Sequence, residues 1–162
     1  MKREHHRWYS DRLGRDMDLL VFGHAGAKLL VFPTRDGRFD EYERIGMIDR
    51  LAPKIAAGQM QVWCLEGVAS ETFYADWMRP ADRIGRFDAY ERYVLDEVMP
   101  MMAAANPHDC TIAHGLSLGA HHAANIAFRH PHLFRKLAAF SGRYRSEEHT
   151  SELQSQFRIS YA

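Results

Sequence analysis

Short apolar runs, separated by polar or glycine-containing segments, divide the chain into predicted strands and helices. Runs rich in Leu, Val, Ile and Phe predict five strands, at Met17–His24, Lys28–Phe32, Gln61–Leu65, Cys110–His114 and Lys136–Phe140. Apolar residues at helical spacing predict helices over Arg38–Asp49, Leu51–Ala57, Asp82–Met99 and Gly119–Arg129.

The order of these elements indicates the fold class. The first two strands are separated only by Ala25, Gly26 and Ala27, which predicts an antiparallel hairpin. From Gln61 onward strand and helix alternate, and such an order requires a mostly parallel sheet with helices on both faces. Pro100 is expected to end the long third helix, because proline has no N–H to donate. We therefore predict one layered α/β domain that is incomplete at its C-terminus.

Composition narrows the class of protein. Apolar residues make up 46% of the chain, enough for a buried core, and the 21 basic side chains are balanced by 21 acidic ones. This balance argues against nucleic-acid and membrane-surface partners, which require a basic excess. The polar start of the chain is not typical of a signal peptide, and no apolar run is long enough to span a membrane. We expect a soluble, cytoplasmic protein with two free thiols, Cys64 and Cys110.

The last 18 residues differ from the rest of the chain. Residues 145–162 are polar and unpatterned, and they match the translation of a common sequencing-library adapter on both sides of its variable index. We expect a non-native tail over 145–162, and the N-terminal part of a single domain over 1–144.

The pentapeptide Gly115-Leu-Ser-Leu-Gly119 carries the candidate chemistry. A predicted strand precedes this Gly-x-Ser-x-Gly motif and a predicted helix follows it, which is the setting of a nucleophile elbow. Glycine at both ends removes side chains that would collide in so sharp a turn. The pattern predicts Ser117 as a catalytic nucleophile, with the N–H of Leu118 donating to the oxyanion.

Four segments, in this order, resemble the "putative esterase" family of esterase D-like proteins in the α/β-hydrolase superfamily. They cover Leu29–Glu43, Tyr90–Pro100, His114–Ala120, and His130–Phe134 together with Ala139–Gly142. The resemblance implies hydrolysis of small-molecule carboxylic esters through an acyl-enzyme. We expect no cofactor, and no metal site, because no two histidines have a metal-ligand spacing with partnering Cys or carboxylates. It also implies that the loop after the second strand donates the other oxyanion N–H, from Thr34 or Arg35.

The chain departs from that family after the motif. In α/β-hydrolases an acidic residue and then a histidine follow the serine. No Asp follows Ser117, and the only Glu residues that do are in the predicted tail, at Glu147, Glu148 and Glu152. Five histidines follow; we expect His121 and His122 on the helix surface, directed away from the serine hydroxyl. The triad acid and base are therefore expected to be missing, and the chain to be inactive as given.

Other interpretations of the sequence remain open. The same fold supports acyl transfer to an acceptor other than water, as in mycobacterial mycolyltransferases, and a non-catalytic α/β interaction module that kept the elbow is a further alternative. Four aromatic residues are equally compatible with an acyl pocket and with core or lid packing: Trp63, Phe73, Tyr74 and Trp77. His114 is expected to pack or to orient the site. Substrate preference and oligomeric state do not follow from the sequence.

Overall fold

A six-stranded sheet organises the chain, with the strand order β1-β2-β4-β3-β5-β6. The structure, a computed structural model, describes residues 1–142 and 144; the predicted tail at 145–162 lies outside the described residues. The strands are β1 Arg3–Ser10, β2 Arg15–Phe22, β3 Ala27–Phe32, β4 Met60–Leu65, β5 Thr111–Leu116 and β6 Lys136–Phe140. The helices are α1 Glu41–Arg44, α2 Met47–Ala56, η1 Ala69–Glu71, α3 Pro80–Tyr93, η2 Val94–Val98, α4 Met99–Ala105 and α5 Leu118–Arg129.

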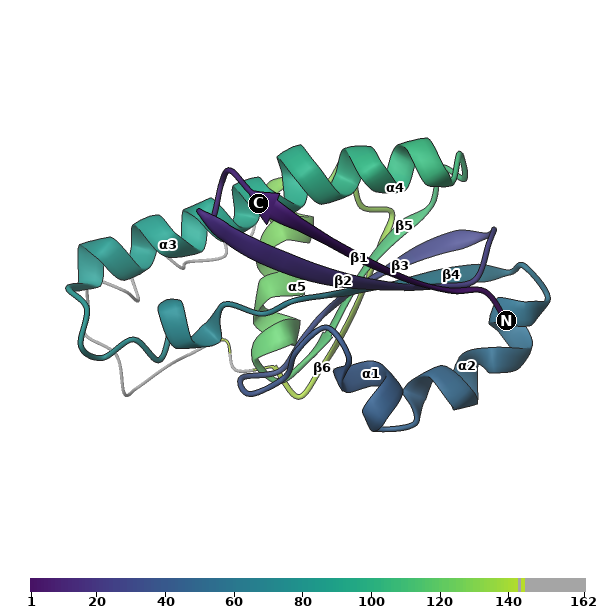
Figure 1. The fold of residues 1–162 in the computed structure, drawn as a ribbon, viewed down its shortest axis with the longest axis horizontal. Helices are drawn as coiled ribbons and strands as arrows, with labels where there is room; N and C mark the ends of the chain where they lie inside the picture. Colours follow the sequence, from purple (N-terminus) through teal and green to yellow (C-terminus); the bar gives the residue numbers. More distant parts are fainter. Residues whose placement is uncertain (143, 145–162) are drawn as a thin grey trace.

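The layering predicted from the sequence is confirmed. Strands β4, β3, β5 and β6 are mutually parallel. Helices α1 and α2 cover one face of the sheet, and α3, α4 and α5 cover the other (Figure 1). Each face therefore has its own apolar core, because a strand directs successive side chains to opposite faces.

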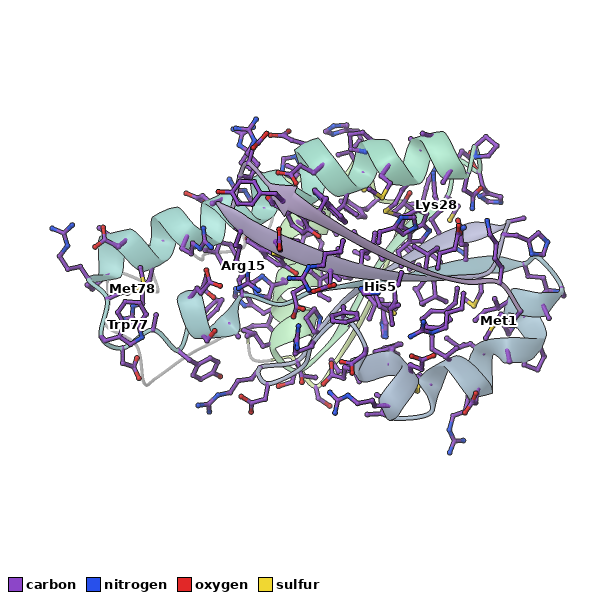
Figure 2. The ribbon with its side chains drawn as sticks, viewed as in Figure 1. Met1, His5, Arg15, Lys28, Trp77 and Met78 are labelled. Atoms are coloured by element: carbon purple, nitrogen blue, oxygen red, sulfur yellow. The ribbon has the colours of Figure 1, made fainter. Side chains whose placement is uncertain are left out.

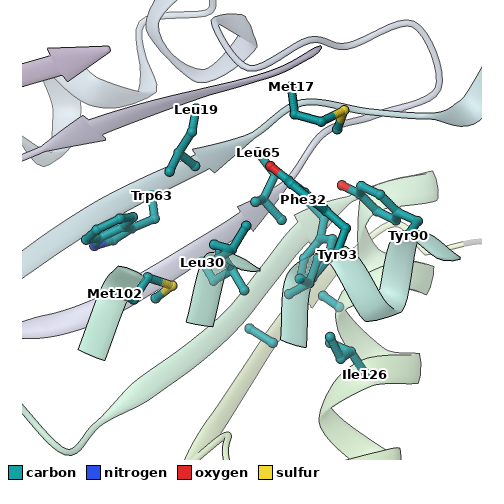
Figure 3. Packing of buried hydrophobic residues seen from close by; sticks show 14 of the residues in the cluster. Met17, Leu19, Leu30, Phe32, Trp63, Leu65, Tyr90, Tyr93, Met102 and Ile126 are labelled. Atoms are coloured by element: carbon teal, nitrogen blue, oxygen red, sulfur yellow. The ribbon is translucent and has the colours of Figure 1, made fainter. Parts of the chain in front are cut away.

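The larger core lies beneath α3, α4 and α5. Figure 3 shows Leu30, Phe32 and Trp63 from the strands together with Tyr93 and Met102 from the helices. The aromatic residues in this core are almost completely buried.

No described helix is both long enough and apolar enough to cross a membrane.

The predicted hairpin is wrong. Strand β2 does pair antiparallel, but with β1 on one side and β4 on the other, so that β4 separates β2 from β3. Strand β1 was not predicted because its residues are mostly polar and alternate between exposed and half-buried positions, as suits an edge strand. Apolar runs locate strands, but they do not specify which strands pair.

Two helix boundaries also differ from the prediction. The helix expected over Arg38–Asp49 is divided at Gly46, whose φ of 75° is left-handed. The helix expected to end at Pro100 instead continues through η2 into α4. Pro100 lies in the first turn of α4, directly after the π-helical η2, where the hydrogen-bond register changes and a missing N–H costs least.

Candidate active site

Ser117 occupies the sharp turn between β5 and α5, as the sequence predicts. Strand β5 ends at Leu116, α5 begins at Leu118, and Ser117 has φ of 53° and ψ of −118°. This left-handed backbone is uncommon for a residue with a side chain and costs of order 1–3 kcal/mol. Ser117 remains partly accessible in this turn.

The two glycines of the motif are required by close packing of backbone on backbone. A Cβ at Gly115 would lie 2.7 Å from the nitrogen of Ala120 in α5. A Cβ at Gly119 would lie 2.7 Å from the carbonyl oxygen of Pro33 and still closer to that of Phe32. Real Cβ atoms do not approach backbone so closely, so a side chain at either position would force the neighbouring backbone to shift. The close packing holds the start of α5 against the ends of β3 and β5.

Backbone hydrogen bonds fix the turn and leave the N–H of Leu118 available. The N–H of Ser117 donates to the carbonyl of Phe140 at 3.0 Å, and that of Ala120 donates to the carbonyl of Ser117 at 3.1 Å. Within residues 1–142 and 144, no acceptor is found for the N–H of Leu118. It is the first N–H of a 12-residue helix, whose dipole favours negative charge at this end.

The loop after β3 lies beside the elbow. Phe32 is the register partner of Gly115, so the following residues 33–37 emerge next to Ser117. The N–H of Thr34 donates to Oε2 of Glu41 at 2.9 Å. For the N–H of Arg35, no acceptor is found in the described part of the chain. Of the two predicted donors, only Arg35 therefore has its N–H available in this arrangement.

Arg35 also places a charged side chain at the loop. Its guanidinium lies 3.7 Å from the centre of the Tyr74 ring, a cation–π contact, and its Nε lies 3.8 Å from a carboxylate oxygen of Asp36. The sequence did not pair Arg35 with Tyr74, because the two are far apart along the chain and the contact arises only in the folded protein.

His114, in β5 just before the elbow, is held in place by two hydrogen bonds. It is 6% exposed, its Nδ1 faces the carbonyl of Ala138, and its Nε2 faces the hydroxyl of Tyr42. A carbonyl only accepts, so Nδ1 carries the proton and the Tyr42 hydroxyl donates to Nε2. Burial lowers the pKa of His114, although the bond to Ala138 acts in the opposite direction. These contacts give His114 the packing and orienting role expected from the sequence.

The expectation that His121 and His122 lie on the helix surface is wrong. They are 5% and 7% exposed, because every residue of α5 from Leu118 to Ala127 is enclosed. The His122 ring stacks on Phe87 with centroids 5.1 Å apart and on Phe32 at 6.1 Å. Burial, reinforced by His121, lowers the pKa of His122 to about 3.

The four aromatic residues considered for an acyl pocket separate in space. Trp63 is buried in the larger core, whereas Trp77 is 80% exposed at one end of the molecule (Figure 2). Phe73 packs edge-on against Phe87 and His121, and Tyr74 lies under Arg35. A small hollow lies beside Phe73, since Phe87 and His122 of its lining pack against that ring. Its lining consists of Phe32, Phe87, Tyr90, Glu91, His122, Asn125 and Ile126.

The remaining described histidines after Ser117 lie far from it. His130 pairs with Glu91 at 3.0 Å, but it follows the last residue of α5, about 18 Å along the helix from the elbow at ~1.5 Å per residue. His132 is exposed two residues further on. No group of three or more potential ligands in residues 1–142 and 144 could hold a metal ion. Glu147, Glu148, His149 and Glu152 lie outside the described residues.

Three solved structures with a similar fold are hydrolases or esterases. An S-formylglutathione hydrolase from Staphylococcus aureus matches with a TM-score of 0.70 at 15% identity, over 95% of this chain and 66% of its own. An S-formylglutathione hydrolase from Agrobacterium tumefaciens gives 0.68 at 16% identity, over 88% and 58%. A CE1 ferulic acid esterase from Anaeromyces mucronatus gives 0.64 at 14% identity, over 87% and 58%.

These likenesses establish the α/β-hydrolase fold, and the chain spans less than two thirds of the length of each of the three proteins. No curated protein matches the chain significantly. The family model described as "Putative esterase" matches residues 10–152, which is most of the chain and includes the strand, elbow and helix around Ser117. The chain belongs to the "Putative esterase" family.

Proposed function

We propose that this chain is the nucleophile-bearing part of a serine carboxylesterase in which Ser117 attacks the ester carbonyl. The observation that carries the proposal is the left-handed backbone of Ser117 at the start of α5. Among the described residues, the N–H groups of Leu118 and of Arg35, in the loop that follows β3, have no acceptor. Membership of the esterase family and the fold shared with esterases support it.

In the proposed reaction the Ser117 Oγ forms a bond to the carbonyl carbon while its proton passes to a general base. The carbonyl oxygen becomes an oxyanion that accepts hydrogen bonds from Leu118 and Arg35. The bond to the alcohol then breaks, and the alcohol leaves with the proton, so that the acyl group remains on Ser117. Water attacks this acyl-enzyme in the same way and releases the carboxylic acid.

We further propose that the base and the acid that orients it are supplied by sequence other than these 162 residues. No Asp follows Ser117 in this chain. Of the histidines that follow it, His122 is enclosed by aromatic rings, and His130 is held by Glu91 at the opposite end of α5. The full-length protein, meaning this sequence completed from its source gene, is therefore the form to assay.

Hydrolysis of p-nitrophenyl acetate by the full-length protein tests the proposal. We expect Ser117→Ala to lower the rate by at least about 10³-fold. Ser70→Ala is the matched control, since Ser70 is an exposed serine in η1 and should leave the rate unchanged. Equal rates for wild type and Ser117→Ala would exclude Ser117 as the nucleophile.

A further inference from the structure

The carboxylate of Glu41 holds the loop of residues 33–37. It accepts the N–H of Thr34 at 2.9 Å through Oε2, and its Oε1 accepts the Thr34 hydroxyl. Both donors of one loop residue therefore bond to one side chain from the first residue of α1. Bonds to a carboxylate are stronger than bonds between neutral groups, so this attachment restrains the loop strongly.

The Glu41 carboxylate occupies space that a side chain at residue 37 would otherwise fill. A Cβ at Gly37 would overlap the carboxylate of Glu41, so the absence of a side chain there makes room for it. The N–H of Gly37 also donates to the carbonyl of Thr34 at 3.2 Å, which closes a tight turn over residues 34–37. At the start of the loop, Gly119 packs against the carbonyl of Pro33, so that both ends of this loop are fixed.

The bonds from Thr34 to Glu41 distinguish the two candidate oxyanion donors, Thr34 and Arg35. The N–H of Thr34 is bonded to Glu41, and the N–H of Arg35 is the next one along the turn. We infer that Glu41 is a positioning residue for the oxyanion hole: by bonding both donors of Thr34, it orients the N–H of Arg35 toward the oxyanion beside the N–H of Leu118. This inference rests on the proposed function, because it assigns a role within that reaction.

A positioning role and a merely structural role predict different kinetics. Oxyanion contacts form in the transition state, so a displaced Arg35 N–H lowers kcat and leaves KM nearly unchanged. A displacement of about 1 Å can cost on the order of 10²-fold in rate. A residue that only stabilises α1 would instead alter the unfolding transition without a selective loss of kcat.

Glu41→Ala and Glu41→Gln in the full-length protein separate these cases. We expect Glu41→Ala to lower kcat by about 10- to 100-fold with KM within about 3-fold of wild type. Glu41→Gln should retain kcat within about 5-fold, because the amide oxygen still accepts from Thr34. Glu43→Gln is the matched control: Glu43 lies in the same helix and pairs with Arg3 at 2.7 Å, and its variant should match wild type.

Two structural measurements make the test independent of turnover. In the NMR spectrum, the Thr34 amide proton should shift upfield in Glu41→Gln and remain unchanged in Glu43→Gln. This holds even if the wild-type protein shows no esterase activity, which would overturn the proposed function alone. If Glu41→Ala does not fold, the spectrum of Glu41→Gln still tests the bond between Glu41 and Thr34, and the phosphonate structure described next decides which N–H binds the oxyanion.

The crystal structure of a phosphonate bound to Ser117 gives the second measurement. We expect a phosphonyl oxygen within hydrogen-bond distance of the nitrogens of Arg35 and Leu118, with Thr34 still bonded to Glu41. An oxygen bound instead by the N–H of Thr34, or a wild-type kcat in folded Glu41→Ala, would overturn the inference.

Discussion

At the scale of single residues, Gly119 decides whether the elbow can form. Its Cα faces the carbonyl groups of Phe32 and Pro33, and a methyl group there would have to displace the end of β3. We predict that Gly119→Ala lowers the free energy of unfolding by about 1–3 kcal/mol, the usual cost of overpacking. Urea denaturation of the full-length protein measures this.

Gly85→Ala is the matched control for that substitution. Gly85 lies inside α3, and a Cβ at this position would have no neighbouring atom within 4 Å. Alanine there should stabilise the helix by about 0.5–1 kcal/mol. If Gly119→Ala stabilised the protein as Gly85→Ala does, the close approach of α5 to β3 would not exist.

His122 makes stability depend on pH. Its pKa is lowered to about 3 by burial and by His121, whereas an unfolded histidine titrates at about 6.5. Between these values the unfolded chain binds the additional proton, so this contribution to stability is lost as pH falls below about 6.5. Glu91 lines the same hollow as His122.

We therefore predict that His122→Phe gains stability relative to wild type at pH 5, by about 1–2 kcal/mol more than at pH 7. Phenylalanine keeps the stacking on Phe87 and cannot take up a proton. Urea denaturation at the two pH values gives this difference. His132→Gln, at an exposed position, is the control; an equal change in both variants would show that His122 is not the group responsible.

At the scale of elements, the sequence pattern predicted the features that depend on neighbouring residues, and it missed those that depend on residues far apart in the chain. The elbow was predictable because its glycines, strand and helix are contiguous in sequence. The pairing of β2 with β4 was not, because it brings together residues about 40 positions apart with no local signal. Strand β1 was missed because its residues are mostly polar. The continuation of the helix past Pro100 was missed because it depends on the π-helical η2 that precedes this residue. Likewise, Glu41 lies within a segment that resembles the esterase family, but its bonds to Thr34 form only in the folded chain.

One buried carboxylate adds hydrogen bonds between α3 and the end of α5 to the aromatic packing between these helices. Glu91 in α3 is 9% exposed and accepts from Asn125 at 3.0 Å, Arg129 at 2.9 Å and His130 at 3.0 Å. Removal of one partner from a buried charged network leaves the others unpaired. We predict that Glu91→Ala destabilises the full-length protein by about 2–4 kcal/mol in thermal or urea unfolding.

Asp88→Ala is the control for Glu91. Asp88 lies one turn earlier in α3, is 61% exposed, and is 3.9 Å from Arg129. An exposed pair contributes less than about 1 kcal/mol. If both variants lost the same stability, the buried network would not add to the attachment of α3 to α5.

At the scale of the whole molecule, the fold brings the elbow and the loop of residues 33–37 together at the carboxyl ends of β5 and β3. The acid and base that the proposed reaction needs are not evident among the described residues. We therefore predict that the 162-residue chain hydrolyses p-nitrophenyl acetate no faster than its own Ser117→Ala variant, whereas the full-length protein shows a Ser117-dependent rate. Ser117-dependent turnover by the short chain would show that one of its own histidines acts as the base.

Aggregation through an exposed strand could also lower the rate of the 162-residue chain. Among the described residues, β6 is the last strand of the sheet and pairs with β5 alone, and Phe140 at its end is 58% exposed. An exposed strand edge favours association between chains. Light scattering should therefore accompany the assay, so that a loss of rate by aggregation is distinguished from the lack of a base.

Trapping the acyl-enzyme tests the central claim most directly. The full-length protein is mixed with p-nitrophenyl acetate, quenched in acid within the first turnover, digested and analysed by mass spectrometry. Our account predicts an acetyl group on the peptide that contains Ser117, its disappearance in Ser117→Ala, and its persistence in Ser70→Ala. An acetyl group on another residue, or turnover with no covalent intermediate under conditions that trap one in a known serine esterase, would contradict the assignment of Ser117 as the nucleophile.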